Sequence, residues 1–270
     1  MRRFPVAAFA ALVVATVAAF FITQHLKVTT PLIAGFPRPF PAAINPLDGV
    51  TCYDPATRKD VNHRFMTISF YLLHQSDEVN VYVVDPAGRI VATLATDRYM
   101  QGGAHPLRTA FVWDGREQTG SVAPDGRYYL RVLLLHQNRT VTISDSSGPV
   151  PVIVRTVAPK PLVTSVTPHA ISRGARTSVK IQYVGNENRG GTVVIYELGH
   201  GKPRAVKSFL TPWKGQSATW DGLIRHRPAP AGRYLIGLDV TDAACNTGRF
   251  PARLPPPPGT VSQAELTVRR

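Results

Sequence analysis

Apolar residues along most of the chain follow the two-residue alternation of β-strands rather than the spacing of helices. Short segments that alternate apolar and polar positions, or that are apolar throughout, are separated by turn-forming residues about every 8–12 positions. No segment after residue 27 keeps a helical period. The pattern therefore predicts an all-β fold, and the strands expected in the first half of the chain are residues 66–72, 79–84, 89–94, 108–113, 127–135, 139–143 and 150–157.

The first 27 residues have a different pattern. Arg2 and Arg3 precede an uncharged apolar run over residues 4–23, and a short polar segment ending in a lysine closes it. A helix of about 20 residues reaches about 30 Å, the thickness of the hydrocarbon core of a membrane. We therefore predict that residues 1–27 are an uncleaved signal anchor with one transmembrane helix through the inner membrane.

A cleaved secretory signal is the alternative for this segment. Residues 17–19 (Val-Ala-Ala) offer a cleavage site, but residues 20–22 continue the apolar run beyond it. In both cases the positive-inside rule keeps the two N-terminal arginines in the cytoplasm and places residues 28–270 outside it. The predicted localisation is the cell membrane, single-pass, with the C-terminal part extracytoplasmic.

The β-strand region contains an internal repeat. A strand ending in Trp-Asp-Gly, a turn, and then Pro-x-Gly-x-Tyr opening the next strand occur twice in the same order. The repeated residues are Trp113, Asp114, Gly115, Pro124, Gly126 and Tyr128 in the first copy, and Trp220, Asp221, Gly222, Pro230, Gly232 and Tyr234 in the second.

Both copies resemble the Ig-like domain of the flagellar hook-capping protein, over roughly residues 65–135 and 177–242. The sequence departs from that family at residues 99–107, which lengthen the loop before the first tryptophan, and at residues 223–225, which replace the usual polar residues. The resemblance implies two tandem Ig-like β-sandwiches after the N-terminal helix.

Composition sets the expected boundaries. Prolines are dense in two segments, one before the first copy and one after the second. The C-terminal segment is either a disordered end or one last strand. The predicted parts are a signal anchor at 1–27, a proline-rich spacer at 28–44, a first sandwich at 45–157, a linker at 158–161, a second sandwich at 162–253 and a proline-rich tail at 254–270.

Physical chemistry accounts for the repeated motif without a ligand. A tryptophan at a strand end buries a large apolar ring over a small core. The Asp-Gly pair supplies a turn, since glycine tolerates positive φ and aspartate accepts nearby amide hydrogens. The tyrosine begins the next strand with its ring inward, in the manner of a tyrosine corner. We therefore expect the twelve repeated residues to be structural.

Catalytic and metal-binding motifs are not evident in the sequence. The eight histidines show no zinc-binding spacing, and neither Gly-x-Ser-x-Gly nor Ser-x-x-Lys occurs. Residues 45–49, followed by Asp54, resemble a calcium-binding loop but offer too few acidic ligands. The sequence predicts neither an enzyme nor a bound cofactor or metal.

The two cysteines, Cys52 and Cys245, lie beside turn-forming residues in different copies. An intramolecular disulfide between them would clamp the two sandwiches together, but it requires Cα atoms within about 7 Å. In an extended tandem the two positions can lie farther apart than that. Two free or separately modified cysteines and an intermolecular disulfide are the other outcomes.

The chain is strongly basic, with 31 Lys and Arg against 17 Asp and Glu and a formal net charge of +14. Export makes nucleic acid an unsuitable partner, whereas anionic lipid head groups and wall polymers are available outside the membrane. The basic residues are spread along the chain, which is also typical of an arginine-rich solvated surface.

These observations favour a non-enzymatic, membrane-anchored tandem Ig-like protein that acts as a spacer or interaction module at the bacterial cell envelope. Its expected partners are the inner membrane, through residues 4–23, and anionic wall polymers or envelope proteins. The alternative is an assembly factor for a flagellar or secretion-type envelope structure, by analogy with the hook-capping protein.

Overall fold

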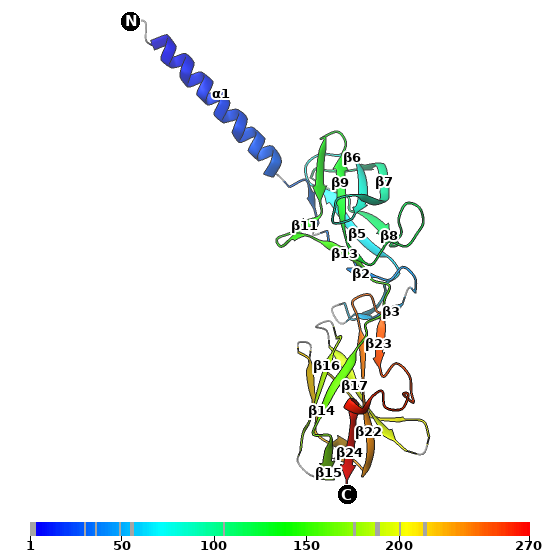
Figure 1. Cartoon of the computed structure of the whole chain (residues 1–270). Coiled ribbons are helices and arrows are strands. Elements are labelled where there is room, and N and C mark those ends of the chain that lie inside the picture. The colour runs from blue at the N-terminus through cyan, green and yellow to red at the C-terminus, as the bar shows by residue number, and fades with distance from the viewer. Residues whose placement is uncertain are drawn as a thin grey trace.

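The protein consists of an N-terminal helix followed by two β-sandwich domains placed one after the other (Figure 1). This architecture is that of a computed structural model, in which the side chains of the helix α1 are described for residues 8–22. The residues that the structure describes are 4–29, 31–35, 37–48, 50–54, 57–104, 106–174, 177–186, 190–199, 201–212 and 215–270.

The helix α1 (Phe4–Thr29) projects away from the sandwiches in Figure 1. Its side chains at residues 8–22 are all exposed, so this stretch packs against neither sandwich. Over the described residues, no helix combines the length and the apolar character needed to cross a membrane. Arg2 and Arg3, on which the predicted orientation depends, lie outside the described residues.

The first sandwich contains a three-stranded sheet in the order β1-β5-β8 and a second sheet in the order β2-β13-β9-β6-β7, in which β10 also pairs with β9. The strands of the first sheet are β1 (Ile33–Ala34), β5 (Met66–Leu72) and β8 (Thr109–Trp113). Those of the second are β2 (Ala43–Ile44), β6 (Asp77–Val84), β7 (Ile90–Met100), β9 (Gly126–Leu134), β10 (Arg139–Thr142) and β13 (Pro151–Val154). Two further hairpins are β3 (Thr51–Asp54) with β4 (Lys59–Asn62), and β11 (Ser144–Asp145) with β12 (Gly148–Pro149).

The second sandwich repeats this topology strand by strand, with sheets in the orders β14-β16-β19 and β15-β24-β22-β17-β18, in which β23 also pairs with β22. The three-stranded sheet consists of β14 (Leu162–Thr167), β16 (Val179–Val184) and β19 (Ser217–Trp220). The larger sheet consists of β15 (Ala170–Ser172), β17 (Gly191–Leu198), β18 (Arg204–Leu210), β22 (Gly232–Thr241), β23 (Thr247–Phe250) and β24 (Glu265–Arg269). A short hairpin, β20 (Leu223–Ile224) with β21 (Arg227–Pro228), follows the second tryptophan.

Each sandwich has its own hydrophobic core, built by the alternation seen in the sequence. Along β5, every second side chain from Met66 to Leu72 is buried, and along β16 every second side chain from Val179 to Tyr183 is buried. Successive side chains of a strand point to opposite faces of its sheet, so each alternating strand contributes one apolar face. The sequence-based prediction of an all-β protein is confirmed.

The structure corrects the predicted spacer at residues 28–44. Leu32 belongs to the core of the first sandwich, β1 pairs with β5, and β2 pairs in parallel with β13. Proline is compatible with short strands at sheet edges, because an edge strand leaves some of its backbone groups unpaired. The proline-rich composition therefore hid the beginning of the first sandwich.

The predicted boundary of the second sandwich at residue 253 is also corrected. After the prolines and a short 3-10 helix η1 (Ser262–Ala264), strand β24 pairs with both β22 and β15. Leu266 and Val268 on β24 are buried in the second core. Of the two outcomes expected for residues 254–270, the structure has the last strand, and this segment is part of the sandwich.

The β3–β4 hairpin distinguishes the two copies. It is inserted between β2 and β5, whereas the corresponding connection between β15 and β16 in the second copy carries no strand among its described residues. Figure 1 shows the hairpin at the end of the first sandwich that faces the second. This insertion positions the candidate site.

Candidate functional site

In the first sandwich the tryptophan and the tyrosine of the repeated motif form a buried pair. The indole Nε1 of Trp113 donates a hydrogen bond to the carbonyl oxygen of Arg116 at 2.8 Å, and the hydroxyl of Tyr128 donates to the carbonyl oxygen of Pro124 at 2.7 Å. The two rings pack edge to face with centroids 5.1 Å apart. Burial raises the pKa of the Tyr128 hydroxyl, which therefore stays protonated and keeps its donor role at neutral pH.

The second sandwich repeats each of these contacts. Trp220 donates to the carbonyl oxygen of Leu223 at 3.0 Å, and Tyr234 donates to that of Pro230 at 2.8 Å. The ring centroids are 6.0 Å apart, and burial raises the pKa of the Tyr234 hydroxyl in the same way.

The Asp-Gly pairs make equivalent turns in both copies. Asp114 and Asp221 each accept, through Oδ1, the backbone amide two residues further on, at 3.1 and 3.0 Å. Gly115 and Gly222 have φ angles of 74° and 72°, in the left-handed region that favours glycine. The other repeated glycines, Gly126 and Gly232, begin the strands β9 and β22. Of the twelve repeated residues, the two tryptophans and two tyrosines belong to the hydrophobic cores, and the aspartates, glycines and prolines lie in the turns and strand ends beside them.

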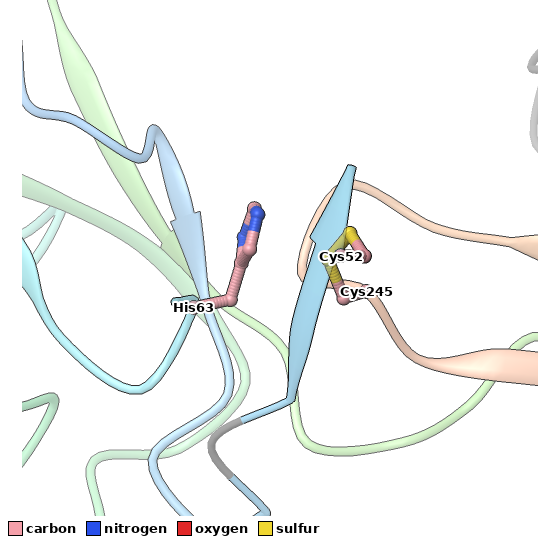
Figure 2. A group of neighbouring side chains, drawn as sticks. All are labelled: Cys52, His63 and Cys245. Carbon is pink, nitrogen blue, oxygen red and sulfur yellow. A yellow bond between two sulfur atoms is a disulfide. The ribbon is translucent and has the colours of Figure 1, made fainter. Parts of the chain in front are cut away.

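Cys52 and Cys245 are brought together by the β3–β4 hairpin. Cys52 lies on β3, and Cys245 lies in the loop between β22 and β23 of the second sandwich. The two residues form an intramolecular disulfide with a Cα–Cα distance of 6.1 Å (Figure 2). Because the hairpin extends from the first sandwich to the second, the distance between the two cores does not prevent the link.

A buried polar network lies in the same junction. The side-chain amide of Asn45 donates to Oδ1 of Asn246 across the two sandwiches at 2.6 Å. Nδ2 of Asn246 donates in turn to Oδ2 of Asp242 at 2.9 Å and to the carbonyl oxygen of Arg155 at 3.0 Å. Buried polar groups with satisfied hydrogen bonds fix one relative arrangement of the segments they join. The network and the disulfide therefore hold the junction at several points.

The loop that carries Cys245 is shaped by its own aspartate. Asp242 accepts the backbone amides of Ala244 at 2.8 Å and Asn246 at 2.9 Å through Oδ1. Cys245 has a φ of 66°, so this tight turn directs its side chain to the hairpin. A Cβ added to Gly248 would collide with the carbonyl oxygen of Pro159, which shows how closely the linker packs against β23.

A cleft of about 540 Å³ opens beside this junction. Residues 39–43 and the β3–β4 hairpin line one side, and the adjoining ends of β17, β18 and β22 line the other. Phe40 and Tyr53 stand in its wall with 47% and 61% of their surfaces exposed. No lysine or arginine is among its described lining residues, whereas three aspartates are: Asp54, Asp239 and Asp242.

Most of the residues that build this junction carry no sequence signal that identifies them as functional. Asn45 was considered only within the weak calcium-loop pattern, but its Oδ1 accepts the backbone amides of Leu47 and Asp48. Asp242 and Asn246 were recognised only as turn-forming residues beside Cys245, and His63 only as one of the histidines without zinc-binding spacing. Their common property is burial of a polar side chain at a contact between domains, which no local pattern encodes.

Removal of Asn246 tests the network directly. We expect Asn246→Leu to lower the free energy of unfolding by about 1–3 kcal/mol, because the buried amide of Asn45 and the carboxylate of Asp242 each lose a partner. Chemical denaturation of the disulfide-linked chain measures the change. The exposed Gln101→Ala serves as the control and should change it by less than about 0.5 kcal/mol; equal effects of the two substitutions would contradict the role of the network.

The fold and the junction define a tandem Ig-like β-sandwich protein. Residues 61–135, within the first sandwich, match the family model of the FlgD Ig-like domain, which confirms the resemblance predicted for the first copy. The same resemblance of residues 177–242 stays a prediction. A comparison with curated proteins gave no match.

Several solved structures are similar to the chain at low identity. The FN1–FN3 domains of chicken CNTN1 share 14% identity with a TM-score of 0.35, and the match covers 77% of this chain and 61% of that one. Latent PorU from Porphyromonas gingivalis shares 14% with a TM-score of 0.25, over 84% of this chain and 18% of that one. A marsupial T cell receptor shares 11% with a TM-score of 0.30, over 76% and 68% of the two chains.

Proposed function

We propose that the protein is a non-enzymatic, membrane-anchored spacer and interaction module on the outer face of a bacterial inner membrane. The main support for this proposal is that a disulfide and a buried polar network join the two sandwiches end to end at the junction. A link of this kind limits rotation between domains, which suits a protein that must hold a binding surface at a fixed distance from its anchor.

We infer the membrane anchor from the sequence of residues 4–23. This segment is an uncharged apolar run of membrane-spanning length, and it follows two arginines. The exposed side chains at residues 8–22 of α1 are apolar or small with few exceptions, and such a surface favours lipid over water. The disulfide is consistent with an oxidising compartment outside the cytoplasm.

Two surfaces are suited to partners. Among the described residues, the edge strand β18 has one side without a neighbouring strand, and such an edge can accept a strand from another protein. The edge strand β7 is partly covered, because the backbone amide of Gln118 donates to the carbonyl oxygen of Val91 at 3.0 Å. Anionic wall polymers suit the basic outer surface of the chain rather than the cleft, because aspartates line the cleft and described lysines and arginines do not.

An assembly factor for a flagellar or secretion-type envelope structure is the second candidate. The match of residues 61–135 to the FlgD Ig-like domain favours it. Because one fold supports many functions, a match at the level of one domain does not identify the partners of the protein. Crosslinking in intact envelopes followed by purification separates the two candidates: wall polymer and wall proteins support the spacer, and flagellar or secretion components support the assembly factor.

Topology is tested with a reporter fused after residue 270 that is active only outside the cytoplasm. We expect the fusion to be active and to remain with the membrane fraction after washing at high salt. Replacing Val13 and Val14 with arginine should prevent insertion of the helix, so that the fusion leaves the membrane fraction and the reporter stays inactive, since each charge at the centre of a spanning helix costs about 2.5–3.5 kcal/mol. An active fusion found in the medium, with a mature N-terminus near residue 20, would show a cleaved signal instead.

A further inference from the structure

We propose that the junction is also a metal site, in which reduced Cys52 and Cys245 bind a thiolate-preferring ion of the Zn²⁺ class together with His63. The site exists in two chemical states. When oxidised, the two sulfurs form the disulfide; when reduced, the same sulfurs and the imidazole become metal ligands that join the two sandwiches.

Three potential ligand atoms already lie together. The two Sγ atoms and a ring nitrogen of His63 all lie within 4.8 Å of one another, and Figure 2 shows the imidazole beside the disulfide. Cys245 and His63 are buried, with 3% and 8% of their surfaces exposed. Cysteine and histidine are the ligands that zinc prefers.

The orientation of His63 suits a ligand. Its Nδ1 lies 2.9 Å from the carbonyl oxygen of Ala43, and because a carbonyl only accepts, Nδ1 must carry the hydrogen. Neutral His63 therefore has its lone pair on Nε2, for which the described residues provide no hydrogen-bond partner. Metal-binding histidines characteristically donate their other N–H to a backbone carbonyl or a carboxylate, which fixes the tautomer and the ring.

The backbone needs little movement to change between the two states. Zn–S bonds of about 2.3 Å place the two sulfurs of a tetrahedral ion about 3.8 Å apart, and a Zn–N bond of about 2.0 Å places the nitrogen about 3.5 Å from each sulfur. Rotation of the cysteine side chains can separate the sulfurs by this amount while the Cα atoms stay near their present distance of 6.1 Å. Cys52 and His63 also line the cleft, which leaves space for a water molecule as fourth ligand.

The chemistry balances with a dithiol as reductant. A protein or small-molecule dithiol donates two electrons and two protons, the Cys52–Cys245 bond breaks, and the reductant becomes a disulfide. Zn²⁺ then displaces one proton from each thiol, so two protons are released and two thiolates neutralise the charge of the ion. Sequence analysis predicted no metal because the three ligands lie on separate segments and their spacing matches no zinc motif.

The test is zinc binding by the full chain in detergent, after reduction and removal of the reductant without air. We expect one Zn²⁺ per reduced chain and none per oxidised chain, measured by equilibrium dialysis, and Co²⁺ should give thiolate charge-transfer absorption with tetrahedral ligand-field bands. His63→Ala should weaken zinc binding by about tenfold or more and change the cobalt spectrum, whereas the exposed His226→Ala should do neither. His63→Ala leaves both cysteines in place. Weaker zinc binding by this variant would therefore show that His63 is a ligand, and unchanged binding would show that the two thiols alone bind the ion.

The proposal is overturned if the reduced chain binds no zinc, or if His63→Ala binds zinc as tightly as the unmodified chain and gives the same cobalt spectrum. The fluorescence of the buried tryptophans reports whether each variant is folded. If the reduced chain unfolds before zinc is added and regains its fluorescence with zinc, the site is supported, because metal binding then restores the junction.

Discussion

Replacing Trp113 with alanine is expected to lower the free energy of unfolding of the first sandwich by about 3–5 kcal/mol. The indole is 2% exposed, packs against Tyr128 and donates a hydrogen bond to the carbonyl oxygen of Arg116. Trp220→Ala should destabilise the second sandwich by a similar amount, because its contacts are equivalent. Denaturation followed by circular dichroism, with each domain's transition assigned by hydrogen exchange, measures both effects.

Neighbouring residues on the same strands provide the controls. Val112 on β8 is 54% exposed, and Thr219 on β19 is exposed, so alanine at either position should change the free energy of unfolding by less than about 0.5 kcal/mol. A Trp113 or Trp220 variant that kept its melting temperature but lost a binding activity would show that the tryptophan is a recognition residue.

Loss of the disulfide is expected to have the second large effect. It spans a sequence separation of 193 residues, and the chain-entropy model assigns a closed loop of that length up to about 5 kcal/mol of stabilisation. The effect should fall mainly on the junction, because each sandwich retains its own core. Limited proteolysis should cut the linker at residues 158–161 faster in the Cys52→Ser, Cys245→Ser double variant.

The unmodified chain, treated with reductant and a metal chelator, is the matched control and should be cut as fast as the double variant. Cleavage of both samples at the rate of the oxidised chain would mean that the polar network alone holds the two sandwiches, and that the disulfide contributes little to their arrangement.

Most of the fold could be predicted because apolar and polar residues alternate along the strands, and this pattern is visible in short stretches of sequence. Strand β5 was predicted with the bounds that the structure has, and the repeated Trp-Asp-Gly and Pro-x-Gly-x-Tyr segments indicated two equivalent domains. The errors fell at the ends of the domains. The short strands β1, β2 and β24 lie beside prolines, and only pairing with distant strands stabilises them.

The candidate site could be predicted only in part. The two cysteines were recognised, but their pairing depends on how far the inserted β3–β4 hairpin extends, which is a property of the assembled domains. Asn45 and Asn246, which are joined by a hydrogen bond, lie on opposite sandwiches and are separated by 201 residues. A short-range pattern holds no information about such a contact, and sequence analysis therefore could not identify the network or His63.

The central claim is that one chain joins its two sandwiches covalently at this junction. Peptide mapping by mass spectrometry, on protein taken from the membrane fraction, alkylated without reduction and isolated as a monomer, tests it most directly. We expect a linked peptide containing Cys52 and Cys245. Recovery of both cysteines in alkylated form, or of the linked peptide only from a covalent dimer, would contradict it.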